Sequence, residues 1–73
     1  MGRTKQIHLR AARKAARLTQ TELAHRLGVH QSRISKLEQG QIDPTLDEAK
    51  AIARILHIDL MRLQFGQLAA VSA

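Results

Sequence analysis

The sequence predicts an all-α domain built from five short helices. Its apolar residues are mostly Ala, Leu and Ile, with one Phe and neither Tyr nor Trp, and this composition favours helices over strands. Two T-x-x-E segments have the spacing of the capping boxes that start helices. Apolar residues recur at helical spacing in the segments that follow. We therefore expect one helical domain over residues 6–73, preceded by a short, mobile, basic arm at residues 1–5.

The first two helices are predicted from composition and from a capping signal. About residues 6–17 are rich in Ala and Arg, which are strong helix formers. Thr19 and Glu22 form the first T-x-x-E segment, in which hydroxyl and carboxylate each accept a hydrogen bond from an otherwise unpaired backbone amide. Gly28 can end this second helix in a left-handed conformation that is more costly for other residues.

The other three helices follow from glycine and from capping residues. A third helix is expected over about residues 31–39, where Gly40 stops it. Thr45 and Glu48 repeat the T-x-x-E spacing and start a fourth helix with the sequence TLDEAKAIARIL. Asp59 is the expected N-cap of a fifth helix that continues through LMRLQF.

Positive charge is concentrated in the first half of the chain. The formal net charge is +6, with nine Lys or Arg and one acidic residue in residues 1–36, against three and five in residues 37–73. A basic half on a small domain is typical of a protein that binds a polyanion. A solvated surface that keeps the protein soluble by repulsion would have the same charge, so charge alone leaves both interpretations open.

Composition also narrows the classes of function. The 73 residues contain no Cys, which excludes disulfides and thiolate metal ligands, and the four His lack metal-ligand spacing. No apolar run approaches the ~18 residues of a membrane span, and no signal peptide is recognisable. We expect a cytoplasmic protein with no cofactor, no metal and no membrane association. Enzymatic activity is not expected either, because there is no nucleophile–base constellation or phosphate loop.

The predicted third helix has an unusual outer face. If Ile34 points inward, steps of roughly 100° per residue place Ser32 and Lys36 on the opposite side, with Arg33 on the flank and Gln31 in the first turn. Gln can bond bidentately to adenine, Arg or Lys can donate to guanine, and Ser suits a base or a phosphate. Polar helix faces are common, so this face becomes informative only together with the preceding helix and glycine turn.

The same helix carries a carboxylate on its inner side. Glu38 falls beside Ile34, and a buried charge without a partner is costly. Arg13 in the first helix is the candidate partner, because a guanidinium can meet a carboxylate bidentately. Alternatively, Glu38 sits at a frayed helix end and is solvated.

The segments from Leu18 to Pro44 resemble the helix-turn-helix domain of the phage repressor and Cro (XRE-like) family. The family pattern appears as LTQTELA from Leu18, GVH from Gly28 and ISKLEQG from Ile34, with Pro44 in the loop that follows. The resemblance covers almost the whole chain, with the motif itself at about residues 19–40. It implies a five-helix lambda-repressor-like fold whose third helix enters the major groove of double-stranded DNA.

The resemblance also implies roles for individual residues. The positions that match base-reading residues are Gln31, Ser32 and Lys36, while Arg33 would read a base or clamp a phosphate. Gln20 matches a phosphate-contacting position of the family, and independently of the resemblance we expect further phosphate contacts from Arg10, Arg26 and His30. The residues with an expected structural role are Arg13 and Glu38 as an internal ion pair, Ala24 at the crossing of the two helices, Gly28 in the turn, and Ile34 in the packing that sets the helix angle.

Three positions depart from the family pattern. His30 occupies a site usually held by Ser or Thr as N-cap, so this cap is expected to be weaker or pH-sensitive. Arg17 and His57 stand where the family often has glycine, so these helix ends are expected to turn less sharply.

The favoured hypothesis is a sequence-specific DNA-binding transcriptional regulator, a repressor that reads a palindromic operator as a homodimer. One short helix reads only about one half-site, and dimers bind half-sites about 34 Å apart. The expected dimer interface comprises Leu60, Leu63, Phe65, Leu68 and Ile55, of which Phe65 and Leu68 fit the core equally well. Three alternatives stay open: the antitoxin of a toxin–antitoxin pair, a protein adaptor that keeps the scaffold, and a nonspecific nucleic-acid coat. A protein partner is compatible with two of these hypotheses: a regulator could contact the polymerase, and an antitoxin would bind a toxin.

Overall fold

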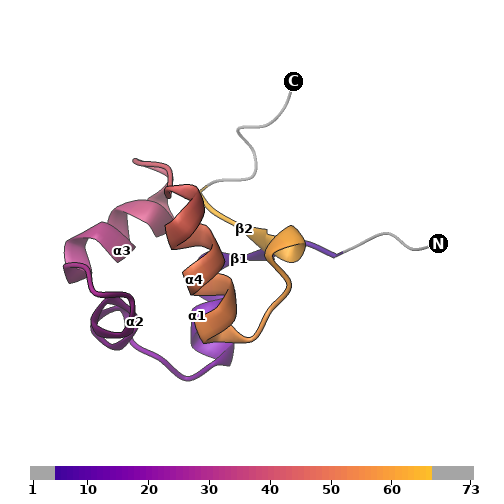
Figure 1. The fold of residues 1–73 in the computed structure, drawn as a ribbon, viewed down its shortest axis with the longest axis horizontal. Helices are drawn as coiled ribbons and strands as arrows, with labels where there is room; N and C mark the ends of the chain where they lie inside the picture. Colours follow the sequence, from indigo (N-terminus) through magenta and orange to yellow (C-terminus); the bar gives the residue numbers. More distant parts are fainter. Residues whose placement is uncertain (1–4, 67–73) are drawn as a thin grey trace.

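The structure, a computed structural model, describes residues 5–66 as four α-helices, one turn of 3-10 helix and a pair of short strands (Figure 1). In chain order these are β1 (Ile7–His8), α1 (Leu9–Ala15), α2 (Gln20–Leu27), α3 (Gln31–Gln39), α4 (Leu46–Leu56), η1 (Leu60–Arg62) and β2 (Leu63–Gln64). A mostly helical fold is confirmed, whereas the all-α, five-helix prediction is wrong. The predicted arm lies outside the described residues except for Lys5, and so does Leu68 of the expected dimer interface.

Both predicted capping boxes are formed. At the start of α2, the Thr19 hydroxyl accepts from the Glu22 amide at 3.0 Å, and Glu22 Oε1 accepts from the Thr19 amide at 2.8 Å. At the start of α4, Thr45 and Glu48 make the same two bonds at 3.0 and 2.9 Å. These reciprocal bonds satisfy amides that have no partner inside a helix, so α2 and α4 begin where the sequence predicts.

The first helix is shorter than predicted. It begins at Leu9, because His8 has an extended backbone and its Nδ1 accepts a hydrogen bond from the Arg10 amide at 3.0 Å. His8 is therefore the N-cap of α1, a role that the sequence did not reveal. Ile7 and His8 form β1 in place of the expected first helical turn.

The fifth predicted helix is reduced to a single 3-10 turn. Asp59 caps it as expected, since Asp59 Oδ1 accepts from the Met61 amide at 3.0 Å. After Arg62 the backbone becomes extended, and Leu63 and Gln64 form β2.

Strands β1 and β2 join the two ends of the described chain. They pair in parallel, with Ile7 opposite Leu63 and His8 opposite Gln64. Just outside the pair, the Arg62 guanidinium donates to the backbone carbonyl of residue 5 at 3.0 Å. In Figure 1 this pair lies behind α4, on the side of the domain away from α2. The two ends of the domain are therefore held together by backbone pairing.

Four helices share one hydrophobic core. Its fully buried side chains are Leu9 of α1, Leu23 of α2, Ile34 and Leu37 of α3, and Ile52 of α4. Burying one such side chain stabilises the fold by roughly 1.5–3 kcal/mol. Since α3 contributes two of them, its orientation on the domain is fixed by the core.

Two helix ends turn more sharply than expected. Arg17 (φ 62°) and His57 (φ 56°) are both left-handed, although neither is glycine. The amides of Leu18 and Ile58 each donate to the carbonyl five residues earlier, at 3.2 and 3.0 Å. These bonds satisfy carbonyls at the ends of α1 and α4, which offsets the strain of the left-handed residue.

Within residues 5–66, no helix has the length and apolar character that crossing a membrane requires.

Candidate nucleic-acid interface

Helices α2 and α3 are joined by residues 28–30 and pack against each other on one side of the domain (Figure 1). Gly28 ends α2 with φ 82°, and its amide donates to the Ala24 carbonyl at 2.8 Å. A Cβ on Gly28 would meet nothing within 4 Å, so the left-handed backbone, and not a lack of space, requires glycine there. Ala24 itself is only 2 % exposed. Its small side chain lies within the packed part of the motif.

The outer face of α3 is polar and open. Ser32 and Lys36 are exposed, and Gln31 is half-buried at the start of the helix. Ile34 and Leu37 are fully buried in the core, so the premise that Ile34 points inward is confirmed. The three residues expected to read bases therefore lie on the outer side of a helix whose inner side is anchored.

The inner side of α3 carries the expected ion pair. Arg13 Nε lies 2.5 Å from Glu38 Oε2, and Nη2 donates to Oε1 at 3.3 Å. Arg13 Nη1 also donates to the Leu18 carbonyl at 2.8 Å. Both charged residues are only 7 % exposed. Burial raises the pKa of Glu38, but the hydrogen bonds from Arg13 and Gln20 outweigh it, so the pKa lies below its ordinary value.

A hydrogen-bonded chain connects this ion pair to the outer face. Gln20 Nε2 donates to Glu38 Oε1 at 3.0 Å, and Gln20 Oε1 accepts from Gln31 Nε2 at 2.6 Å. Gln31 keeps a second Nε2 hydrogen, and its Oε1 accepts no bond from the part of the chain that the structure describes. This donor and acceptor are the two groups that the edge of an adenine requires. Gln20, expected to contact a phosphate, thus also orients Gln31.

Arg33 does not join the outer face. Its Nε and Nη2 donate to Glu48 Oε2 and Oε1 at 2.5 and 2.7 Å, so the guanidinium is turned towards α4. These hydrogen bonds from Arg33 are the main reason that the pKa of Glu48 is lowered to about 2. The sequence predicted that Arg33 contacts DNA and did not indicate this ion pair.

His30 caps α3 in place of the usual hydroxyl residue. Its Nδ1 accepts from the Ser32 amide at 3.1 Å and lies 3.0 Å from Ser32 Oγ. An imidazole nitrogen can accept a hydrogen bond only while it carries no proton. The cap therefore depends on the neutral form of His30.

An open, polar cleft runs beside the start of α2. It has a volume of about 580 Å³, and its lining residues are His8, Arg10, Gln20, Glu38, Gln39 and Gln41. Two of the expected phosphate contacts, Arg10 and Gln20, are thereby brought together, whereas Arg26 is exposed in the last turn of α2 and does not line the cleft. His8 and Gln41 are additions that the sequence did not indicate.

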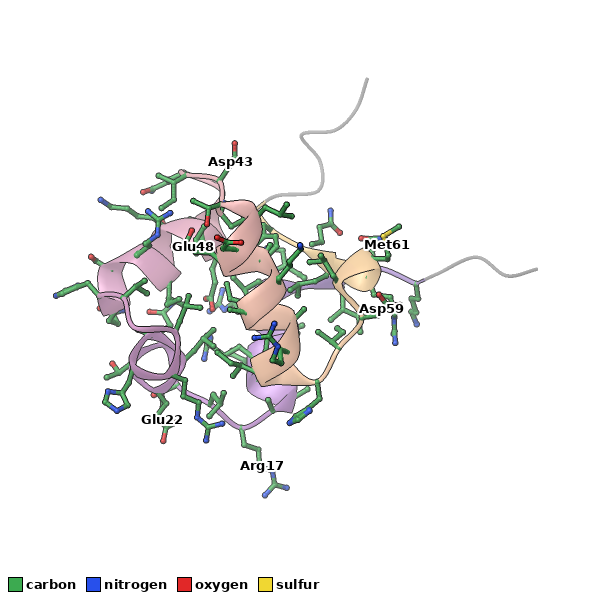
Figure 2. The ribbon with its side chains drawn as sticks, in the orientation of Figure 1. Arg17, Glu22, Asp43, Glu48, Asp59 and Met61 are labelled. Carbon is green, nitrogen blue, oxygen red and sulfur yellow. The ribbon has the colours of Figure 1, made fainter. Side chains whose placement is uncertain are left out.

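The residues expected at a dimer interface differ in how deeply they are buried in their own chain. Leu63 belongs to the core of its own chain and is only 7 % exposed, so it offers little surface to a partner. Ile55, Leu60 and Phe65 are partly buried against the core. Met61, which the sequence did not single out, is 74 % exposed and points outwards from η1 (Figure 2).

No group of three or more His, Asp or Glu side chains within residues 5–66 could hold a metal ion.

The polar-faced helix and the helix before it define a helix-turn-helix protein. A family model described as Helix-turn-helix matches residues 9–63, so the chain belongs to this family. An uncharacterized HTH-type transcriptional regulator of Sinorhizobium fredii is 42% identical over 53 residues, which are 73% of this chain and 27% of that protein. A second protein of that description, from Methanothermobacter thermautotrophicus, is 48% identical over 48 residues, 66% of this chain and 70% of its own length.

The chain therefore spans about a quarter of the length of the first relative and 70% of the length of the second. No solved structure matches the chain significantly.

Proposed function

We propose that this protein is a sequence-specific, double-stranded DNA-binding transcriptional regulator that acts as a repressor. The observation that carries the proposal is the outer face of α3, where Ser32 and Lys36 are exposed and the Gln31 side chain at the start of the helix is already oriented by Gln20. A recognition helix needs this combination, because base readout requires side chains held in a fixed geometry on a rigid element. The two relatives are named HTH-type transcriptional regulators, which supports the same function.

In the proposed complex, α3 lies in the major groove and the cleft beside it faces the DNA backbone. Arg10 and Gln20 line that cleft and contact phosphates, and Arg26 contacts the backbone from the end of α2. The phosphate contacts add affinity for every sequence and make binding weaken as salt rises. Gln31, Ser32 and Lys36 add the preference for one sequence.

The proposed functional unit is a homodimer on a palindromic operator. One helix of the length of α3 reads only about one half-site, and a two-fold axis places a second copy about 34 Å away. Leu60, Phe65 and Ile55, together with exposed Met61, offer the apolar surface for this contact. In Figure 1, η1 lies across the domain from α3, so this surface stays free when α3 contacts DNA. Repression follows from occupying a promoter.

A selection from random duplexes, followed by affinity measurements on two variants, tests the proposal. The selected site is expected to contain a palindrome. Gln31→Ala is expected to cost about 1–3 kcal/mol on that site and to relax the preference at one base position. Arg10→Ala is expected to weaken selected and random duplexes alike. Equal behaviour of the two variants would contradict the assignment of roles, and a protein that shifts no duplex would be an adaptor instead.

Sedimentation over a range of concentrations tests the dimer. Met61→Asp is expected to shift the protein to monomer and to weaken binding to the full palindrome, while binding to an isolated half-site is unchanged. A variant that dimerises like the unaltered protein would exclude this surface.

A further inference from the structure

The strongest unexplained feature of the domain is the ion pair between α3 and α4. Arg33 is in the first turn of the proposed recognition helix, directly after Ser32, where a free guanidinium would add to binding of any DNA sequence. It instead makes two bonds to Glu48, at 2.5 and 2.7 Å, so its planar donor fork is already matched to a carboxylate.

Glu48 is fixed in position by its own helix. Its Oε1 accepts from the Thr45 amide at 2.9 Å, and its amide donates to the Thr45 hydroxyl at 3.0 Å. A carboxylate in the first turn also interacts favourably with the positive end of the helix dipole. The Glu48 side chain is 16 % exposed against 35 % for Arg33, so the carboxylate is the more anchored of the two. An anchored carboxylate can hold a flexible arginine in one direction.

Capping alone does not explain the ion pair. Glu22 occupies the same position in the capping box of α2 and makes the same two bonds with Thr19. The structure records no ion pair for Glu22 within the described residues. A capping glutamate is therefore sufficient without an arginine, and the contact with Arg33 is an additional property of Glu48.

We propose that Glu48 is a positioning residue that withholds Arg33 from DNA phosphates and thereby lowers the affinity for DNA of any sequence. The inference rests on the proposed function. A cation that neutralises a phosphate strengthens binding to all sequences equally. Because Glu48 accepts from both Nε and Nη2 and balances the charge of Arg33, a phosphate meets only the remaining N–H donors of a guanidinium that is already neutralised. The share of affinity that is independent of sequence is thereby reduced, while Gln31, Ser32 and Lys36 remain available for base contacts.

Glu48→Gln separates the two roles of Glu48, and Glu22→Gln is the matched control. Glutamine also serves in capping boxes, so both variants keep the cap and lose one negative charge. Affinity is measured for the selected duplex and for a random duplex of equal length, over a range of salt concentrations. Glu48→Gln is expected to bind the random duplex roughly three- to tenfold more tightly than Glu22→Gln does. The slope of the logarithm of its binding constant against the logarithm of the salt concentration is expected to be steeper by about 0.9, which corresponds to one further phosphate contact. Because a phosphate contact does not depend on sequence, the selected duplex is expected to gain affinity by a similar factor.

The double variant Arg33→Gln with Glu48→Gln provides a second measurement. It removes the pair without changing the net charge, so the gain in random-duplex affinity and the steeper salt dependence are expected to disappear. Thermal unfolding of each variant shows that the domain is folded at the assay temperature.

Three results would overturn the proposal. Equal changes in Glu48→Gln and Glu22→Gln would show an effect of net charge only. Weaker binding by Glu48→Gln would show that the ion pair presents Arg33 to DNA instead of withholding it. A gain that persists in the double variant would have a source other than Arg33. In all three cases the unaltered protein still binds its selected duplex, so the proposed function stands. If neither the unaltered protein nor any variant binds duplex DNA, the proposed function and the role of Glu48 are both overturned.

Discussion

Replacing Arg13 with methionine should destabilise this domain strongly. Methionine fills a similar volume but has no charge, so Glu38 is left on the inner side of α3 with Gln20 as its remaining side-chain donor. The Leu18 carbonyl also loses the bond from Arg13 Nη1. Removing one partner of a buried ion pair costs about 3–5 kcal/mol, because the other charge stays buried without compensation.

This cost is large for a chain of 73 residues. Domains of this length have a free energy of unfolding of about 4–11 kcal/mol. We therefore expect Arg13→Met to lose roughly a quarter or more of the stability. Urea unfolding followed by circular dichroism measures the loss as a lower midpoint with an unchanged slope.

A double variant, Arg13→Met with Glu38→Leu, tests the reason for the loss. Replacing both charges of a buried pair by apolar residues is often close to neutral. The double variant is therefore expected to be about 3–5 kcal/mol more stable than Arg13→Met alone. A double variant that is less stable than the single one would refute the reasoning, as would a single variant that costs less than about 1 kcal/mol.

The pH dependence of the unfolding free energy tests the same reasoning independently. In the unaltered protein the pKa of Glu38 lies below 4.5, so the stability from its charged form is present above about pH 4.5 and is lost as the pH falls below that value. In Arg13→Met, burial without the guanidinium raises the pKa, so acidification stabilises the variant. The difference in unfolding free energy between the two proteins is therefore largest near about pH 7 and shrinks towards about pH 4.

Substitutions at three further positions test single features of the backbone and the caps. His57→Gly should raise the unfolding free energy by about 0.5–1 kcal/mol in thermal melts, because it relieves a left-handed residue at the end of α4, whereas His57→Ala should give no gain. Gly66→Ala should cost about 1–3 kcal/mol in urea unfolding, since its Cβ would lie 2.8 Å from the Gly40 Cα; an unchanged midpoint would contradict this close approach. His30→Ala should cost about 0.5–2 kcal/mol by the same assay, and His30→Ser should restore the cap of α3; equal stability of these two variants would exclude the cap.

Much of the fold could be predicted from short stretches of sequence. The two T-x-x-E segments contain both donors and both acceptors of their boxes within four residues, so Thr19 and Thr45 start helices as predicted. Gly28 ends α2 by the same local logic. Prediction from short stretches failed where an unexpected residue type took a structural role. His8 is the N-cap of α1, and Arg17 adopts a left-handed backbone although it is not glycine.

The candidate site was predictable in part. The periodicity of α3 placed Ser32 and Lys36 outside and Glu38 inside, because a helix repeats at a fixed angle. Periodicity could not show that Gln20 bonds to Gln31, since these residues belong to different helices. It equally could not show that Arg33 points to α4 instead of outwards.

By itself, the sequence determined where α2, α3 and α4 begin and end, and which face of α3 is polar, because these properties depend on residues a few positions apart. The tertiary structure alone decided the parallel pairing of Ile7 with Leu63, which replaced part of one predicted helix and shortened another. It also decided that Arg33 meets Glu48, 15 residues away. Contacts of this kind form only after the core has brought separate elements together, and no local pattern of residue types encodes which groups will then be adjacent.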